Sequence, residues 1–391
     1  MIRNWWLNGF VAAALLTPAA LSHVSPAAAG EAVVHSFQNN GADGYEPYAA
    51  LTNVNGILYG TTYSGGANGV GTVYAINAKT EKVVYSFQNN GADGAYPTAG
   101  LINVKGTLYG TTYGGGVKAV GTVFRLSPAT GKEKVVYSFC SAGGTCEDGY
   151  LALAGLTAVN GILYGTTSAG GTANGGTVFS LNRTTGSEAV IYSFQRDGSD
   201  GNTPYAGLVN VGGTLYGATK SGGVDGFGTA FSVNPATGAE KVLHSFQGAD
   251  GYQPYAGLIN VKGTLYGTTV NGGANDYGTV FAIDPKTGAE TVLHSFAGGT
   301  DGYDPEAPLI NVNGTLYGTT YAGGVNSGGT VFKINRTTGA EKVVYSFCGQ
   351  AGCADGASPL AGLIDVNGLL YGTTLGGGAH GQGTVFKIKL R

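Results

Sequence analysis

The chain has 391 residues, including 72 glycines and 12 prolines, and its 20 basic and 23 acidic side chains give a net charge of −3. The apolar content of 42% and the low charge exclude a disordered chain, and the lack of a basic excess argues against a nucleic-acid partner. Each glycine inside a helix costs about 1 kcal/mol relative to alanine, so a helical protein is disfavoured. A large all-β protein remains.

Residues 1–29 have the pattern of a secretory signal peptide. Arg3 precedes an apolar run from Leu7 to Leu21, and small residues then lead to Ala29. A membrane anchor is the alternative, but the apolar run is short, contains Pro18 and is followed by Pro26. We therefore expect cleavage near Ala29, no membrane insertion of the mature protein, and a secreted or periplasmic location.

Internal repetition dominates residues 31–391. Each repeat contains four segments rich in β-branched and aromatic residues, called strands a to d here, of the types LINV, TLYGTT, GTVFKI and KVVYSF. An antiparallel unit of this kind, about 50 residues long, is the blade of a β-propeller. The tripeptide Leu-Tyr-Gly marks strand b of seven repeats, with tyrosine at positions 59, 109, 164, 216, 266, 317 and 371.

The connections between these segments favour the same architecture. Strands a and b are separated by two residues of which the second is always glycine, as in Asn55-Gly56, and this predicts a type I′ turn. The repeat region begins with a lone strand d, Ala32–Phe37, and ends with a lone strand c, Gly383–Leu390. Pairing these two strands completes the seventh blade and hides the sheet edges. We predict one seven-bladed propeller domain over residues 30–391.

Three motifs run through the repeats: SF…DG…P, NG-x-LYGTT and GG…GTVF. On these motifs, residues 31–391 resemble the GloVer tandem-repeat family of exported bacterial proteins. The resemblance implies a β-propeller fold and export, and it implies no particular biochemical activity.

The d-to-a and b-to-c loops of a propeller lie on one face, called the loop face here, and their length and variety place a functional site there. Every d-to-a loop carries an Asp-Gly pair. A ring of carboxylates that binds calcium is one interpretation, but recurrence in every blade favours Asx turns. We therefore expect no metal and no cofactor. The aspartates stand at positions 43, 93, 148, 200, 250, 301 and 355.

Twelve of the 24 tyrosines fall in loops of the loop face. A tyrosine offers an apolar ring and a hydroxyl, which suits sugars or peptides, whereas the alternative is that the rings cap the blade ends. The residues five positions after each loop aspartate should surround the channel mouth: Tyr48, Thr98, Leu153, Tyr205, Tyr255, Glu306 and Leu360. We predict that an extracellular glycan or protein binds to Tyr48, Tyr63, Tyr113, Tyr205, Tyr255, Glu306 and Tyr321.

Patterns that carry catalysis are weak. A group of His380, Lys220 and Glu306 could abstract a proton in a polysaccharide lyase. The double glycines after strand b lack the helix and lysine of a phosphate loop, and nucleophile elbows and zinc-type histidine spacings are absent from the sequence. Three histidines replace the tyrosine of strand d and are expected in the core: His35, His244 and His294.

We therefore expect a monomeric, non-enzymatic binding protein. A carbohydrate-active enzyme, either a lyase or a hydrolase, and a structural cell-surface protein are the alternatives. The enzyme would use the same face as the binding protein.

The four cysteines occur in two copies of one d-to-a loop, CSAGGTC and CGQAGC. In an oxidising compartment we predict structural disulfides between Cys140 and Cys146 and between Cys348 and Cys353. A redox pair is the alternative, but neither loop has the C-x-x-C spacing.

Overall fold

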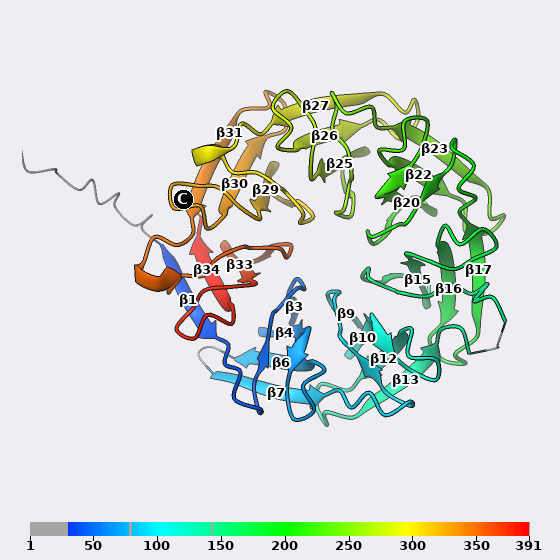
Figure 1. Ribbon diagram of the computed structural model, residues 1–391, viewed down its shortest axis with the longest axis horizontal. Coiled ribbons are helices and arrows are strands. Elements are labelled where there is room, and N and C mark those ends of the chain that lie inside the picture. Colours follow the sequence, from blue (N-terminus) through cyan, green and yellow to red (C-terminus); the bar gives the residue numbers. More distant parts are fainter. Residues whose placement is uncertain (1–29, 78–79, 142–143, 391) are drawn as a thin grey trace, which may run out of the picture.

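The computed structural model describes residues 30–77, 80–141 and 144–390, so the predicted signal peptide lies outside the described residues. The chain forms seven four-stranded antiparallel sheets, and Figure 1 shows them arranged in a ring about a central axis. The seven-bladed propeller predicted from the repeats is confirmed. Among the described residues, no helix has the length and apolar character needed to span a membrane.

The blades follow one another in chain order, and each runs from strand a at the channel to strand d at the rim (Figure 1). Blade one contains β3 (Thr52–Val54), β4 (Ile57–Thr62), β6 (Thr72–Asn77) and β7 (Thr80–Ser86). Blade two contains β9 (Ile102–Val104), β10 (Thr107–Thr112), β12 (Thr122–Leu126) and β13 (Glu133–Ser138). Blade three contains β14 (Thr157–Val159), β15 (Ile162–Thr167), β16 (Thr177–Asn182) and β17 (Glu188–Ser193).

The next three blades repeat the pattern. Blade four contains β19 (Val209–Val211), β20 (Thr214–Thr219), β22 (Thr229–Val233) and β23 (Glu240–Ser245). Blade five contains β24 (Ile259–Val261), β25 (Thr264–Thr269), β26 (Thr279–Ile283) and β27 (Glu290–Ser295). Blade six contains β28 (Ile310–Val312), β29 (Thr315–Thr320), β30 (Thr330–Asn335) and β31 (Glu341–Ser346).

Blade seven is built from both ends of the described chain. Its inner strands are β32 (Ile364–Val366), β33 (Leu369–Thr374) and β34 (Thr384–Lys389), and its outer strand is β1 (Glu31–Ser36). β1 and β34 pair in antiparallel register from Glu31 opposite Ile388 to Ser36 opposite Thr384. The predicted closure of the ring by these two strands is confirmed.

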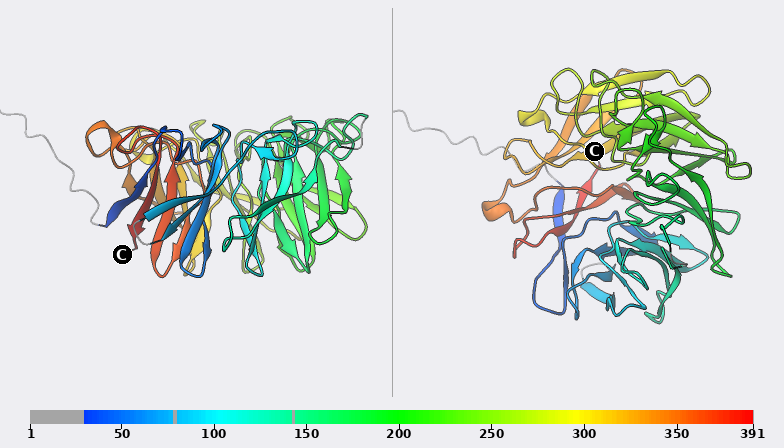
Figure 2. Two further views of the ribbon diagram at one scale, coloured as in Figure 1. Left: turned by 90° about the horizontal axis from the view of Figure 1, so that it is seen from below. Right: turned by 45° about the vertical axis from the view of Figure 1, so that its right-hand side comes forward.

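The a-to-b turns have the backbone that their sequence predicts. In blade one, Asn55 and Gly56 have φ angles of 53° and 86°, so both lie in the left-handed region that a type I′ turn requires. The Asn53 side chain stabilises the turn by accepting a hydrogen bond from the Gly56 amide at 2.8 Å. These short turns lie on the face opposite the long loops (Figure 2, left).

The long loops on the loop face are joined by short pairings that the sequence did not predict. In three blades, a d-to-a loop pairs with the b-to-c loop of the same blade: β2 (Gly44–Tyr45) with β5 (Ser64–Gly65), β8 (Gly94–Ala95) with β11 (Gly114–Gly115), and β18 (Gly201–Asn202) with β21 (Ser221–Gly222). Two further d-to-a loops contain short 3-10 turns, Gly299–Asp301 and Ala351–Cys353.

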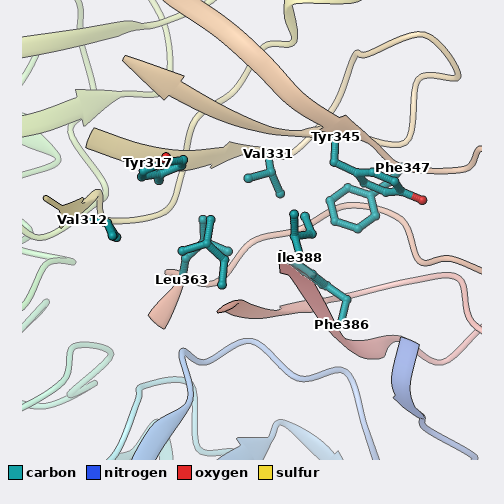
Figure 3. Packing of buried hydrophobic residues seen from close by; sticks show 9 residues of the cluster. Val312, Tyr317, Val331, Tyr345, Phe347, Leu363, Phe386 and Ile388 are labelled. Carbon is teal, nitrogen blue, oxygen red and sulfur yellow. The ribbon is translucent and has the colours of Figure 1, made fainter. Parts of the chain in front are cut away.

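The hydrophobic core lies between neighbouring blades. The phenylalanine after each strand d is fully buried and meets an aromatic ring in strand c of the next blade, as Phe347 meets Phe386 at 4.9 Å between ring centroids. Figure 3 shows this boundary, where Leu363 and Ile388 of blade seven pack near Tyr317 and Val331 of blade six. Burying one such aromatic side chain contributes about 1.5–3 kcal/mol. The seven boundaries between blades therefore stabilise the closed propeller.

Candidate functional site

The central channel opens on the loop face into a cavity of about 370 Å³. Each d-to-a loop contributes its last residues to the cavity wall, beginning five positions after the loop aspartate, and the residues that follow are mainly alanine, glycine and leucine. Neighbouring loop segments approach closely there, since a Cβ at Gly207 would lie 3.1 Å from the Gly155 carbonyl oxygen. The wall contains all seven residues that the sequence placed at the channel mouth: Tyr48, Thr98, Leu153, Tyr205, Tyr255, Glu306 and Leu360.

Backbone hydrogen bonds fix these loop ends. The residue before each loop proline has a positive φ, for example 57° at Thr203, and its carbonyl accepts the amide of the residue after strand b. Thr203 accepts from Lys220 at 3.1 Å, and Glu46 accepts from Tyr63 at 2.9 Å. The residues after strand b are therefore attached to the loop ends in every blade: Tyr63, Tyr113, Ser168, Lys220, Val270, Tyr321 and Leu375.

One aromatic group extends from blade one to blade two. The ring centroids of Tyr48 and Tyr63 are 5.3 Å apart, and those of Tyr63 and Tyr96 are 5.0 Å apart. Burial, with the Glu46 carboxylate as the next cause, raises the pKa of Tyr48 above its ordinary value. The Tyr48 hydroxyl is therefore protonated at neutral pH and can donate a hydrogen bond to a ligand.

A second aromatic group spans blades four and five and contains a cation. The ring centroids of Tyr205 and Tyr255 are 5.1 Å apart. The Lys220 ammonium lies 5.2 Å from the Tyr205 centroid and 5.0 Å from the Tyr255 centroid, which is the range of a cation–π contact. Burial lowers the pKa of Lys220, but the Tyr255 hydroxyl, Tyr205 and Glu306 outweigh this effect and raise it overall. Lys220 is therefore positively charged.

Glu306 supplies the acidic group of the cavity wall. Burial raises the pKa of Glu306, the nearby Asp304 raises it further, and Lys220 opposes the rise. Glu306 and Lys220 thus belong to one electrostatic site although they come from blades six and four. Together with the tyrosine hydroxyls, they offer both donors and acceptors beside flat apolar rings.

The structure separates the predicted ligand-binding residues into two groups. Tyr48, Tyr205, Tyr255 and Glu306 line the cavity. Tyr63 packs against Tyr48 with its ring tilted by 59° and, like Tyr113 and Tyr321, belongs to the residues after strand b, outside the cavity wall. The side chain of Tyr113 is 37% exposed. Thr98 and Leu153 separate the two aromatic groups, so the tyrosines do not form one continuous arc.

Two contacts of this site were missed by sequence reasoning. Tyr96 extends the first aromatic group, and Lys220 lies over the rings of the second. The sequence singles out Lys220 because it follows strand b at a position where three other blades have tyrosine. Its contacts with the rings of Tyr205 and Tyr255 could not be inferred from that position.

Of the three residues that could form a lyase group, only Glu306 lines the cavity. Lys220 and Glu306 act on each other electrostatically. His380 instead lies exposed in the loop between β33 and β34 and is not part of the cavity wall. The sequence could place all three residues on the loop face, but it could not give the separations between blades.

The expectation of three core histidines was wrong. The side chains of His35, His244 and His294 are 19–20% exposed, and each Nε2 atom lies 2.7–3.3 Å from the aspartate of its own d-to-a loop. The strand-d position lies at the edge of the core, where the ring packs edge-on against the buried phenylalanine two residues later and its polar atom reaches the loop. The aspartates also bond the backbone as expected, since Asp43 accepts hydrogen bonds from the Gly44 amide at 2.7 Å and from the Gln38 amide at 3.0 Å.

Both predicted disulfides are confirmed. Cys140 is bonded to Cys146, and Cys348 is bonded to Cys353. Each bridge closes a d-to-a loop on the loop face, beside a carboxylate that holds the same loop: the Cys140 amide donates to Asp148 at 2.7 Å.

Seven blades of repeated sequence surround a channel whose mouth is lined by the ends of the d-to-a loops. This arrangement defines a β-propeller built from tandem repeats. The family model described as the Gloeobacter/Verrucomicrobia repeat matches residues 17–231 and 210–391. The chain belongs to this family, which confirms the resemblance seen in the sequence motifs. A comparison with the curated proteins finds no match.

Solved structures share the propeller fold at low sequence identity. The extracellular domain of a putative hybrid two-component system from B. thetaiotaomicron matches with a TM-score of 0.60 and 8% identity over 91% of this chain. The match spans 39% of the chain in that structure. An oligogalacturonate lyase in complex with manganese matches with a TM-score of 0.51 and 12% identity, over 89% of each chain.

Proposed function

We propose that this protein is an exported binding protein that holds a glycan at the channel mouth on its loop face. The observation that carries the proposal is the pair of Tyr205 and Tyr255, with Lys220 over both rings, in the wall of a 370 Å³ cavity. Flat apolar rings stack on the C–H faces of sugars, while the hydroxyls, Lys220 and Glu306 bond to sugar hydroxyls.

Two further features support this function. The two disulfides fit an oxidising compartment, which agrees with export and with an extracellular ligand. The cavity is preformed, because backbone hydrogen bonds and buried alanines and glycines fix its wall. A ligand therefore binds without the entropic cost of ordering the loops.

The test is a glycan array probed with residues 30–391, followed by calorimetry on each oligosaccharide that binds. Tyr205→Ala and Tyr255→Ala should each weaken binding about fivefold, because one stacking ring contributes about 1 kcal/mol. Tyr205→Phe, which retains the ring, should lose less affinity.

Tyr277 provides a matched control for these variants. It is 42% exposed and stacks on Tyr303 at 5.5 Å, but neither ring belongs to the cavity wall. Tyr277→Ala should leave glycan affinity unchanged. Absence of binding across the array, or equal losses in Tyr277→Ala and Tyr205→Ala, would overturn the proposal and favour a protein partner or a structural role.

Catalysis is the second candidate function, because Glu306 in the cavity wall offers an acid or base and Lys220, over the rings of two wall tyrosines, offers a cation nearby. Its test is incubation of the bound oligosaccharides with wild type, Glu306→Gln and Lys220→Ala, with product analysis by mass spectrometry. Cleavage by wild type and its loss in Glu306→Gln would favour a carbohydrate-active enzyme over a binding protein.

A further inference from the structure

A second repeated feature lies at the rim, between the outer strands of neighbouring blades. At each boundary, a tyrosine or histidine of strand d meets the aspartate of its own d-to-a loop, and the glutamate that begins strand d of the next blade lies beside them. At four boundaries a tyrosine hydroxyl donates to the aspartate at 2.7–2.8 Å: Tyr85 to Asp93, Tyr137 to Asp148, Tyr192 to Asp200 and Tyr345 to Asp355.

At the other three boundaries histidine replaces the tyrosine. The Nε2–Oδ2 distance is 3.3 Å for His35 and Asp43, 2.7 Å for His244 and Asp250, and 3.2 Å for His294 and Asp301. In each case, one oxygen of the next glutamate joins the group, so that the three atoms lie within 4.8 Å of one another. The three groups are His35 with Asp43 and Glu81, His244 with Asp250 and Glu290, and His294 with Asp301 and Glu341.

In each histidine group the aspartate is hydrogen-bonded, whereas the glutamate has one oxygen without a partner, as the strand-d glutamates of the tyrosine boundaries also have. The Oε1 atoms of Glu81, Glu290 and Glu341 are buried and have no hydrogen-bond partner among the described residues. In the same part of the chain, no lysine or arginine forms an ion pair with them, since the ion pairs found all join a histidine to an aspartate. Two carboxyl groups thus converge on one imidazole at each of these boundaries, and a bound divalent cation would balance their charge.

We propose that the three histidine boundaries are binding sites for a divalent transition-metal ion such as Zn²⁺. The ligands are the histidine Nε2, one aspartate oxygen and one glutamate oxygen, and water completes the coordination. An imidazole with carboxylates suits Zn²⁺ and its neighbours in the first transition row better than Ca²⁺ or Mg²⁺, which prefer oxygen ligands alone.

The bound ion would join two blades at the rim. Because His35 lies on β1 and Glu81 on β7, one site joins blade seven to blade one at the closure of the ring. The other two sites join blades four and five and blades five and six. The ion therefore cross-links two strands that belong to different sheets and share no backbone hydrogen bonds.

The three sites differ in the number of hydrogen bonds that the Oδ2 atom of the aspartate already accepts. Oδ2 of Asp43 also accepts the Gln38 amide, and Oδ2 of Asp301 also accepts the Ala297 amide. In contrast, Oδ2 of Asp250 bonds only to His244 among the described residues, because the Gln247 amide uses Oδ1. We expect the His244 site to bind the ion most tightly.

The test is titration of EDTA-treated, untagged residues 30–391 with Zn²⁺, followed by calorimetry and by thermal unfolding. Wild type should bind three ions and unfold at a higher temperature with Zn²⁺. His35→Tyr, His244→Tyr and His294→Tyr should each remove one ion, and the triple variant should bind none. These variants should fold, because tyrosine is the residue that the other four boundaries use at this position.

Two matched controls make the result specific. His380→Tyr changes the one remaining histidine of the described chain and should retain three ions. Tyr192→His, beside Asp200 and Glu240, should create a fourth site. Wild type that binds no Zn²⁺, or a triple variant that binds as many ions as wild type, would overturn the proposal. Circular dichroism of each variant confirms that the β-sheet content is retained.

Discussion

The glycine of each Asp-Gly pair shows how closely the loops approach the blades. In blade two, strands b and c are joined by a hydrogen bond between the Thr112 and Thr122 hydroxyls at 2.9 Å. Gly94 packs directly onto this pair, and a Cβ there would lie 2.6–2.8 Å from their side-chain atoms. The loop can therefore reach the blade only if this residue has no side chain.

We expect Gly94→Ala to destabilise the protein by about 1–3 kcal/mol, because the methyl group overpacks a rigid site. Urea unfolding monitored by circular dichroism measures the loss. Gly376→Ala is the matched control: its backbone also avoids the left-handed region, and its Cβ would meet other atoms only at 3.8–3.9 Å. A change of less than about 0.5 kcal/mol is expected there, and equal losses in the two variants would contradict the explanation.

At this scale the sequence predicted positions better than contacts. The seven residues of the cavity wall could be identified because every loop has the same number of residues between its aspartate and strand a. The contact of Lys220 with two tyrosines could not be identified, because it depends on side-chain directions in two neighbouring blades. The three histidines were misplaced for a related reason, since their partners lie in a loop whose path the strand pattern does not give.

The outer strands carry an unusual concentration of acids at the blade boundaries. Burial, and then the charge of Asp93, raises the pKa of Glu133 to about 8, while the Tyr85 hydroxyl opposes the rise. Burial and Asp148 raise the pKa of Glu188 to about 7 in the same way, against the effect of Tyr137. Each of these glutamates is the first residue of a strand d and lies at a blade boundary where the strand-d residue of the preceding blade is a tyrosine.

We expect the free energy of unfolding to fall as the pH rises from about 5 to about 8. A carboxyl whose pKa is higher in the folded state than its ordinary value of 4.5 binds a proton on folding, so its stabilising effect is lost as the pH passes the folded value of about 7–8. Urea unfolding at several pH values with EDTA present measures this slope. Glu133→Gln combined with Glu188→Gln should make the slope shallower without removing it, because burial raises the pKa of five other strand-d glutamates to about 7; an unchanged slope would contradict the assignment.

The strands themselves were largely predictable. Alternating β-branched and aromatic residues between glycine turns located the four strands of each blade, and the closing strand predicted over Ala32–Phe37 is observed over Glu31–Ser36. The two-residue strands of the loop face, such as Gly44–Tyr45, were not predictable. Segments this short have no periodicity, and they pair because the blades bring their loops together.

The ring as a whole is held by seven similar boundaries, of which one contains the closing strand. Phe37 follows β1, is fully buried and lies 5.1 Å from the Tyr74 ring. Phe194 occupies the same position in blade three, is equally buried and lies 5.1 Å from the Phe231 ring. The two residues differ mainly in that β1 is connected to the described ring through one end alone.

Phe37→Ala and Phe194→Ala should each reduce the free energy of unfolding by about 3–5 kcal/mol, as expected for a large cavity in the core. We expect the two variants to differ in their susceptibility to limited proteolysis under native conditions. Phe37→Ala should be cut rapidly near β1, because a strand attached at one end can detach without opening another blade, while Phe194→Ala should resist. Equal cutting of both variants near β1 would show that the closing strand is no weaker than the others.

The closing strand also determines how the molecule can be oriented. The Lys389 amide donates to the Gly30 carbonyl at 3.2 Å, and the Leu390 amide donates to Gly368 in the a-to-b turn of blade seven. Both ends of the described chain therefore lie on the face of short turns, while the cavity opens on the opposite face (Figure 2, left). A support or fusion partner attached at either end would present the cavity outward to the medium, so an immobilised layer of this protein would keep its channel mouths accessible.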